Sequence, residues 1–206
     1  MPRPRKASDE DVFAAAVRVM QRVGPGDFTL DAIAREAGIT AGALVQRFGS
    51  KRALQIRLAE GAAAGMPSIL DEIRARHTSP LAALREYATC MADLAPSPDA
   101  FVRSLAYLLE DLTDPALRTQ LERQQRGTRA ALEKMIRDAV AAGELTNNAS
   151  ATSLARAIEA LLAGSLLTWA IHRSGSASAW LRRDLDSIIQ PYRPRDARRK
   201  KRAAAV

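Results

Sequence analysis

The sequence has little of what catalysis, disulfide scaffolds and metal binding require. Its 206 residues include one cysteine, Cys90, and two histidines, His77 and His172. A single cysteine excludes an intrachain disulfide and fits a reducing compartment. The chain has no HExxH sequence, no cysteine cluster and no glycine-rich phosphate loop. We therefore expect no catalytic residues, no metal site and no cofactor.

Long apolar runs and a secretory leader are also missing. No uninterrupted apolar stretch reaches the roughly 18 residues that span a bilayer, and the start, MPRPRK, lacks the apolar segment of a signal peptide. Apolar residues, many of them alanine and leucine, make up 47% of the chain, whereas aromatic residues make up 4%. This composition favours helix, and no segment alternates with a period of two as a strand would. The expectation is a cytoplasmic, all-α protein.

Positive charge is present, but it is concentrated at the two ends. The net charge is +8, of which residues 1–6 contribute +3 through Arg3, Arg5 and Lys6. Residues 191–206 contribute +6, which leaves −1 on residues 7–190. Such charge runs predict a flexible basic arm over residues 1–7 and a disordered basic tail over residues 191–206. These tails either serve solubility alone or attract DNA without reading its sequence.

Residues 28–51, FTLDAIAREAGITAGALVQRFGSK, predict two short helices joined by a tight turn. Thr29 and Thr40 can each cap a helix N-terminus, and Gly38 between them can take the left-handed conformation that ends a helix. Apolar residues recur at spacings of three and four in the first helix, at Leu30, Ile33, Ala34 and Ala37. In the second helix, Ala43, Leu44 and Phe48 are expected to face inward. This is the pattern of a helix-turn-helix, whose second helix fits the major groove of DNA.

The face that the second helix leaves outward is small or polar. The candidate DNA-binding residues are Thr29, Thr40, Ala41, Gly42, Val45, Gln46, Arg47 and Lys51. Residues 37–59 contain four basic side chains and no acidic one, and this composition suits a surface that lies against phosphates. The alternative is an ordinary helical hairpin with a solvated basic face.

These residues resemble the N-terminal domain of the TetR family of bacterial transcriptional regulators. The matching positions are Phe28-Thr29, Ile33-Ala34, Ala37-Gly38-Ile39-Thr40, Leu44, Phe48 and Lys51. The resemblance implies that the second helix reads bases and that Lys51 touches a phosphate. At one position the chain departs from the family, which usually carries a tyrosine that contacts the DNA backbone. Val45 stands there instead, and valine can touch a thymine methyl group.

Capping signals divide the rest of the chain into helices and two domains. Ser8 and Asp11 form a capping-box pattern that opens a first helix with Phe13, Val17 and Met20 as its apolar stripe. We predict a DNA-binding domain over residues 8–57 and a C-terminal domain over residues 58–190. A fourth helix begins after Ser50, and Pro67 should kink or end it. Ser-Pro and Asp-Pro pairs predict helices over 80–94, 98–112 and 115–142, the second of which is expected to bury Phe101, Leu105, Leu108 and Leu112.

Two further helices are predicted over 149–173 and 177–190, and they carry more apolar surface than a small lobe can hide. The resemblance implies that these two helices form a four-helix interface in a homodimer. The expected interface residues are Leu154, Ile158, Leu162, Leu166, Trp180, Leu185 and Ile188. The alternative is that both helices belong to an internal core.

The resemblance further implies an effector cavity in a C-terminal helical bundle. Candidate pocket residues are Tyr87, Met91, Phe101, Tyr107, Gln124, Thr128 and Trp169, a mixed set that suits a moderately apolar, neutral small molecule. The function that follows is a ligand-responsive, sequence-specific regulator that binds double-stranded operator DNA. We expect a repressor that a small molecule releases from a palindromic operator. The competing hypothesis is a helical scaffold or interaction protein whose tails bind nucleic acid non-specifically.

Overall fold

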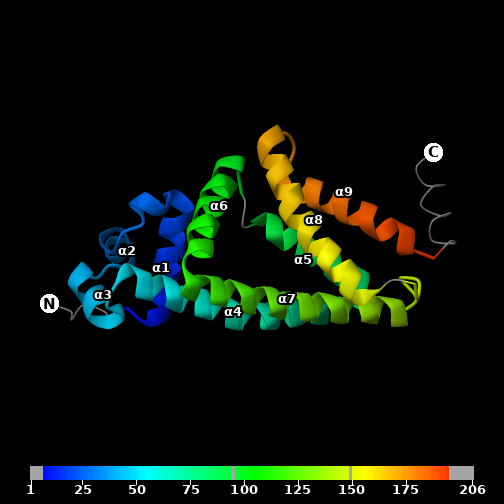
Figure 1. The fold of residues 1–206 in the computed structure, drawn as a ribbon, viewed down its shortest axis with the longest axis horizontal. Coiled ribbons are helices and arrows are strands. Elements are labelled where there is room, and N and C mark those ends of the chain that lie inside the picture. The colour runs from blue at the N-terminus through cyan, green and yellow to red at the C-terminus, as the bar shows by residue number, and fades with distance from the viewer. Residues whose placement is uncertain (1–6, 94–95, 149, 195–206) are drawn as a thin grey trace. The chain divides into compact units, whose positions relative to one another are not determined.

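The computed structural model describes residues 7–93, 96–148 and 150–194, and all regular structure within these ranges is helical (Figure 1). The helices are α1 (Asp9–Arg22), α2 (Leu30–Ala37), α3 (Ala41–Phe48), α4 (Lys51–Ala75), α5 (Pro80–Asp93), α6 (Pro98–Thr113), α7 (Pro115–Ala141), α8 (Ala151–His172) and α9 (Ala177–Ile189). Short 3-10 turns, η1 (Pro25–Asp27) and η2 (Gln190–Tyr192), follow α1 and α9. The prediction of an all-α fold is confirmed, and the predicted helix ends after residue 80 lie within about two residues of the observed ones. Residues 1–6 and 195–206, which hold most of the predicted arm and tail, lie outside the described residues.

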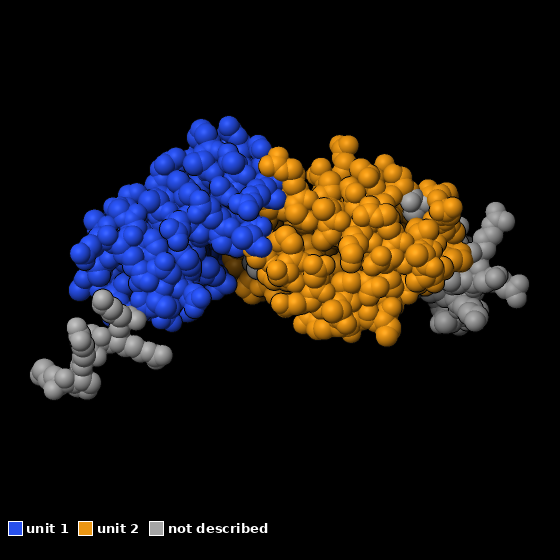
Figure 2. Space-filling model, turned by 90° about the horizontal axis from the view of Figure 1, so that it is seen from below, with its two compact units in different colours: residues 1–64, 102–123 blue, residues 65–101, 124–206 orange. Residues whose placement is uncertain are grey.

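The chain forms two compact units, coloured separately in Figure 2. Unit 1 comprises residues 1–64 and 102–123, and unit 2 comprises residues 65–101 and 124–206. The chain passes from one unit to the other within α4, α6 and α7. Unit 1 therefore includes a segment, 102–123, that the sequence pattern assigns to the C-terminal domain.

The core of unit 1 is built from α1, α2, α3, the start of α4 and Tyr107 of α6. Its fully buried side chains include Val12, Phe28, Ile33, Leu44 and Leu54. The predicted capping box is present at the start of α1, because the Ser8 hydroxyl accepts a hydrogen bond from the Asp11 amide at 3.0 Å and the Asp11 carboxylate accepts one from the Ser8 amide at 2.8 Å.

The predicted apolar stripe of α1 is wrong at Val17, which is 45% exposed. Phe13 and Met20 are half-buried and pack against the core. The fully inward residues are Val12, Ala15, Ala16 and Val19. The small side chains of Ala15 and Ala16 let α2 pack closely against α1. The packing against α2 determines which face of α1 is buried.

The predicted stripe of α6 is wrong at Leu108 and Leu112, whereas Phe101 and Leu105 are half-buried. Leu108 and Leu112 are exposed, at 39% and 44%, and Tyr107 is buried in their place. The Tyr107 hydroxyl donates to the Val23 carbonyl at 3.0 Å, and its ring meets Phe28 edge-on at 5.7 Å. These contacts turn the tyrosine side of α6 toward the unit 1 core and leave the leucines outside.

Unit 2 has its own core, to which α4, α5, α7, α8 and α9 contribute. Helix α4 neither ends at Pro67 nor breaks there, but continues to Ala75. Leu70 and Ile73, which follow the proline, are almost completely buried, and their burial holds the helix together despite the missing amide donor. Gly127 of α7 faces the proline ring, since a Cβ atom at Gly127 would lie 3.3 Å from Pro67 Cγ.

Among the described residues, α8 is the one helix that is both long enough and apolar enough to cross a membrane. Its best 18-residue window has a mean hydropathy of 1.5, and 39% of that window is buried. By length and composition alone it could cross a bilayer, which the sequence analysis did not expect. The core helix of a water-soluble protein meets the same criterion, and six α8 residues are buried.

Candidate functional site

The helix-turn-helix of unit 1 forms as its sequence predicts. The Thr29 and Thr40 hydroxyls accept hydrogen bonds from the Ala32 and Ala43 amides, both at 3.1 Å, and so cap α2 and α3. Gly38 has φ of 69°, in the left-handed region that a Cβ atom disfavours. The turn places Leu44 of α3 in the same buried cluster as Ile33 of α2. Because its inner face is locked into this core, α3 is a rigid element with a defined outer face.

The outer face of α3 carries most of the predicted DNA-contacting residues. The exposed residues are Thr40, Gly42, Val45, Gln46 and Arg47. The apolar side chain among them, Val45, is 48% exposed. Ala41 is half-buried, and Thr29 is exposed at the start of α2. Ala43, predicted to face inward, is instead exposed, because Leu44 takes the single fully buried position on this short helix.

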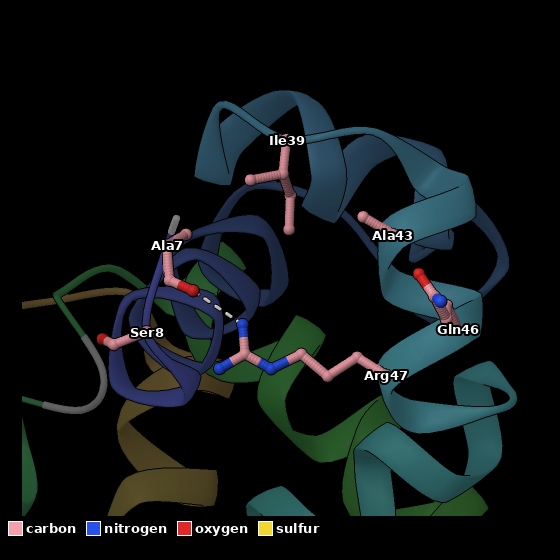
Figure 3. Close-up of a pocket in the computed structure, with 6 residues that line it drawn as sticks. All are labelled: Ala7, Ser8, Ile39, Ala43, Gln46 and Arg47. Carbon is pink, nitrogen blue, oxygen red and sulfur yellow. Dashed lines mark hydrogen bonds between the residues drawn. The ribbon is translucent and has the colours of Figure 1, made fainter. Parts of the chain in front are cut away.

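A hollow of about 650 Å³ opens beside this face, lined by residues from the α2–α3 turn, α3 and the start of α1 (Figure 3). Its lining residues are Ala7, Ser8, Ile39, Ala43, Gln46 and Arg47. Gln46 makes no hydrogen bond within the described part of the chain, so its amide is available to an outside partner. An amide with both a donor and an acceptor can bind adenine through two hydrogen bonds in the major groove.

The basic residues near α3 are less available than the sequence suggests. Arg47 donates to the Ala7 carbonyl at 2.6 Å and forms an ion pair with Asp9. Arg52 forms two hydrogen bonds with the Asp114 carboxylate, at 2.5 and 2.9 Å, and this contact lowers the pKa of Asp114 to about 2. The acidic partners, Asp9 of α1 and Asp114 before α7, are distant in the sequence. The lack of acidic residues between 37 and 59 therefore did not predict that these arginines would be free of ion pairs.

Lys51 is also held by unit 1. Its ammonium donates to the Pro25 carbonyl at 3.2 Å and lies 5.6 Å from the centre of the Phe28 ring. A lysine ammonium has three donors, so this one hydrogen bond leaves others for a phosphate. Arg35 of α2 is exposed and has no ion pair within the described residues; the sequence reasoning did not single it out.

Unit 2 contains a polar cluster formed by Tyr87 of α5, Arg129 of α7 and Glu159 of α8, here called the interior polar cluster. The Glu159 side chain is 9% exposed and the Arg129 side chain 37%. Arg129 Nε donates to Glu159 Oε2 at 2.8 Å, and Arg129 Nη2 forms an ion pair with the same oxygen at 2.7 Å. Glu159 Oε1 is buried and has no hydrogen-bond partner. Burial and the Glu159 charge raise the pKa of Tyr87 to about 12. A buried acceptor left without a donor is unfavourable by roughly 1–3 kcal/mol, so this atom is suited to accept a donor from a bound molecule.

The predicted pocket residues fall in two places. Tyr87, Thr128 and Trp169 are buried in unit 2, and Met91, Phe101 and Gln124 are half-buried there. Tyr107 belongs instead to the core of unit 1, so its assignment to a pocket in the C-terminal bundle was incorrect. The Trp169 indole donates to the Gly175 carbonyl at 3.1 Å, which ties it to the α8–α9 connection. Glu159 was not predicted as a pocket residue. The only indication in the sequence is that it is the single acidic residue of an apolar helix.

Most of the predicted interface residues lie inside their own subunit. Leu154, Ile158, Leu162 and Leu185 are 0–5% exposed in the unit 2 core, while Leu166, Trp180 and Ile188 are half-buried. The buried positions lie on one face of α8, and the opposite face is exposed. That face, here called the outer α8 face, consists of Ala160, Ala163, Gly164, Leu167 and Ile171, with Leu167 47% and Ile171 70% exposed.

Neither histidine joins a group of metal-ligating side chains within the described ranges. His77 contacts the Glu86 carboxylate, and the His172 ring stacks on Trp180 with the ring centres 5.5 Å apart. Both contacts are structural.

Comparison with known protein families decides the classification. Residues 12–58 match the family of bacterial regulatory proteins known as tetR, and residues 109–185 match the tetracyclin repressor-like C-terminal domain. The chain belongs to the TetR family. Together the two matches cover both the helix-turn-helix of this TetR-family protein and most of its α7–α9 segment. Its place in the family makes it a DNA-binding transcriptional regulator.

Solved structures of TetR-like proteins share the fold. A TetR regulator from Haloarcula marismortui is 17% identical, with 90% of this chain and 98% of that chain covered and a TM-score of 0.72. FadR from Bacillus subtilis, determined with stearoyl-CoA, is 16% identical over 88% and 98% of the two chains, with a TM-score of 0.68. FadR from Thermus thermophilus, a repressor determined with lauroyl-CoA, is 19% identical over 88% and 93%, with a TM-score of 0.57. No curated protein sequence matches this TetR-family chain significantly.

Proposed function

We propose that this TetR-family protein is a cytoplasmic repressor that binds a palindromic operator as a homodimer and leaves it when a small molecule binds unit 2. The observation that carries the DNA-binding part is the outer face of α3. That face presents Val45 and an unpartnered Gln46, while Leu44 locks the inner face into the core. A rigid helix with free base-reading groups fits the major groove.

Gln46 is the expected base reader on this face. Gln46→Ala should cost roughly 1–3 kcal/mol on the preferred duplex and relax preference at one base position in each half-site. Lys51→Ala, by contrast, should weaken binding to all sequences about equally, because phosphates carry no sequence information. Titration of each variant against the preferred duplex and its single-base variants measures both effects. Unchanged base preference after Gln46→Ala would remove Gln46 from this role.

A homodimer is proposed because of the outer α8 face. Its exposed leucine and isoleucine lie beside small residues, and a Cβ atom at Gly164 would meet no atom of its own subunit within 4 Å. The subunit therefore gives no reason for glycine at this position, whereas close approach of a second helix would. Two subunits related by a two-fold axis present two copies of α3 to inverted half-sites.

The effector is proposed to bind unit 2 at the interior polar cluster. Glu159 Oε1 lacks a hydrogen-bond partner, and Ile158 and Leu162 of the same helix belong to the apolar core of unit 2. The proposed effector is therefore an apolar molecule with one N–H or O–H group. The two FadR relatives were determined with acyl-CoA molecules, which share the apolar chain but are anionic. A buried carboxylate disfavours an anionic head group beside it.

Helix α4 can transmit this binding, because it runs without interruption from unit 1 into unit 2 and has Pro67 at the start of its unit 2 portion. The two α3 helices bind well only when their separation matches successive major grooves, about 34 Å or a multiple. An effector that favours another position of α4 changes this separation. The coupling cannot exceed the difference in effector affinity between the two states, on the order of 1–3 kcal/mol.

Three probes with the same alkyl chain, 1-decanol, decanoate and decanoyl-CoA, test the proposed head-group preference. The alcohol should release the protein from its operator at lower concentration than either anion, because only the alcohol donates to Glu159 Oε1 without introducing a charge. Glu159→Gln offers an amide donor and should shift the preference toward decanoate. Release by decanoyl-CoA but not by 1-decanol, with no change in Glu159→Gln, would contradict the proposed effector class while leaving DNA binding intact.

A further inference from the structure

The connection between α1 and α2 is a loosely packed turn that α6 anchors. Its centre is Gly24-Pro25-Gly26, and a Cβ atom at either glycine would meet no atom within 4 Å beyond its chain neighbours. The Tyr107 hydroxyl of α6 donates to the Val23 carbonyl, directly before this turn, at 3.0 Å. The Tyr107 ring meets the Phe28 ring, just after the turn, edge-on with the ring centres 5.7 Å apart. Tyr107 therefore contacts both ends of the turn.

The same turn holds Lys51. The lysine ammonium donates to the Pro25 carbonyl at 3.2 Å and lies 5.6 Å from the centre of the Phe28 ring. A lysine side chain is a flexible four-carbon stem, so its ammonium has a defined place only where its partners are fixed. Both partners of Lys51 belong to the segment that Tyr107 contacts. The place of the ammonium therefore depends on a side chain of α6.

Tyr107 is suited to anchor this turn because its hydroxyl remains a donor. Burial raises the pKa of Tyr107 to about 12, and the charges of Glu110 and Asp27 act in the same direction. The hydroxyl is therefore protonated at neutral pH. The side chain is only 3% exposed, and a phenylalanine at this position would fill the same space without donating to Val23.

We propose that Tyr107 is a positioning residue for the phosphate contact of Lys51, and that it acts through the turn at residues 24–26 and the Phe28 ring. This inference rests on the proposed function, in which Lys51 binds a phosphate of the operator. Holding the ammonium in place before DNA binds reduces the entropy that the lysine loses on binding. A residue that was predicted to line the effector pocket is thereby assigned to the DNA-binding surface.

Tyr107→Phe tests the proposal, because it keeps the ring and removes only the hydroxyl that donates to Val23. Pro25→Gly is the second variant, since it loosens the same turn without altering the buried cluster of unit 1. Tyr192→Phe makes the same chemical change in unit 2 and is the matched control. All are compared with Lys51→Ala on a duplex that the wild-type protein selects from random sequence.

Two measurements separate positioning from stability. The first is the slope of log affinity against log salt concentration, to which each phosphate contact contributes about 0.9. The second is a scan of duplexes in which one phosphate at a time is replaced by a neutral methylphosphonate. The position at which the wild type loses affinity and Lys51→Ala does not is the Lys51 phosphate. Partial unfolding lowers the affinity for every duplex alike, so it changes neither measurement.

Lys51→Ala should lower the salt slope by about 2, because a homodimer loses two phosphate contacts. Tyr107→Phe and Pro25→Gly should each lower it by about 1 or more and lose most of the sensitivity to methylphosphonate at the Lys51 phosphate. Base preference should not change in either variant. Combining Tyr107→Phe with Lys51→Ala should lower the slope no further than Lys51→Ala alone, since both act through one contact. Tyr192→Phe should match the wild type.

A folded Tyr107→Phe protein with the wild-type salt slope and the wild-type sensitivity at the Lys51 phosphate would overturn the proposal. If Tyr107→Phe does not fold, the same result in Pro25→Gly would overturn it. Failure of the wild-type protein to select any sequence, or of Lys51→Ala to differ from it at any phosphate, would instead refute the proposed function. The two failures are therefore distinguishable.

Discussion

Leu167→Glu and Ile171→Glu are each expected to convert the protein to monomers that bind operator about 10²–10⁴-fold more weakly. Both side chains are exposed on the outer α8 face, at 47% and 70%, so a carboxylate there does not disturb the core of the subunit. In a dimer, however, each carboxylate would be buried against the partner's apolar face without a counter-ion. The affinity falls because the second α3 no longer binds at the high effective concentration that linkage provides.

Light scattering and operator titration measure these two effects together. Lys134→Glu is the matched control, because it places the same carboxylate on an exposed position of α7 and should leave both the mass and the affinity unchanged. Leu162→Glu would be a poor test, since Leu162 is only 5% exposed within its own subunit and the variant would lose its fold. A dimer that persists in both α8 variants would show that the subunits associate through another surface.

Leu44→Ala is expected to destabilise unit 1 by about 2–5 kcal/mol and to abolish operator binding at physiological temperature. Leu44 is fully buried and is the only buried residue of α3, so its truncation leaves a cavity that an eight-residue helix cannot close. Val45→Ala on the same helix changes a side chain that is 48% exposed and should alter stability by no more than about 0.5 kcal/mol. The pair separates loss of the fold from loss of a surface group.

The positions of the tryptophans make this effect measurable one unit at a time. Both, Trp169 and Trp180, lie in unit 2, so tryptophan fluorescence follows unit 2 while circular dichroism follows all helices. Heating Leu44→Ala should give an early loss of helix signal with little early change in fluorescence. An equal shift of both transitions would contradict separate stabilities for the two units.

Local signals in the sequence were sufficient to predict the helices. Serine, threonine and aspartate caps, prolines at first turns and Gly38 act over three or four residues, and the helices they predict are present. Long-range contacts were not predictable in this way. Tyr107 and the leucines of α6 have similar spacing, and only the Val23 carbonyl and the Phe28 ring decide that the tyrosine faces inward.

The same distinction applies to the candidate site. The outward face of α3 followed from periodicity, apart from two alanines. Ala43 is exposed, whereas Ala41 joins Leu44 and Phe48 against the core. Arg47 was predicted to contact DNA on a surface that has no acidic residue nearby in the sequence. Its ion pair with Asp9 forms only through the fold. On α8, apolar residues surround most of the helix, so composition could not tell the face that fills the unit 2 core from the face left for a partner.

Selection of binding sites from random double-stranded DNA tests the central claim most directly, namely that this protein reads a two-fold site through α3. The wild-type protein should enrich an inverted repeat whose half-site centres are about 34 Å apart, or a multiple of that distance. Its preference over random DNA should persist as salt is raised, because base contacts depend less on salt than phosphate contacts do. Enrichment of no sequence, with binding that disappears uniformly as salt increases, would contradict the account and favour a helical protein that binds nucleic acid only through its charge.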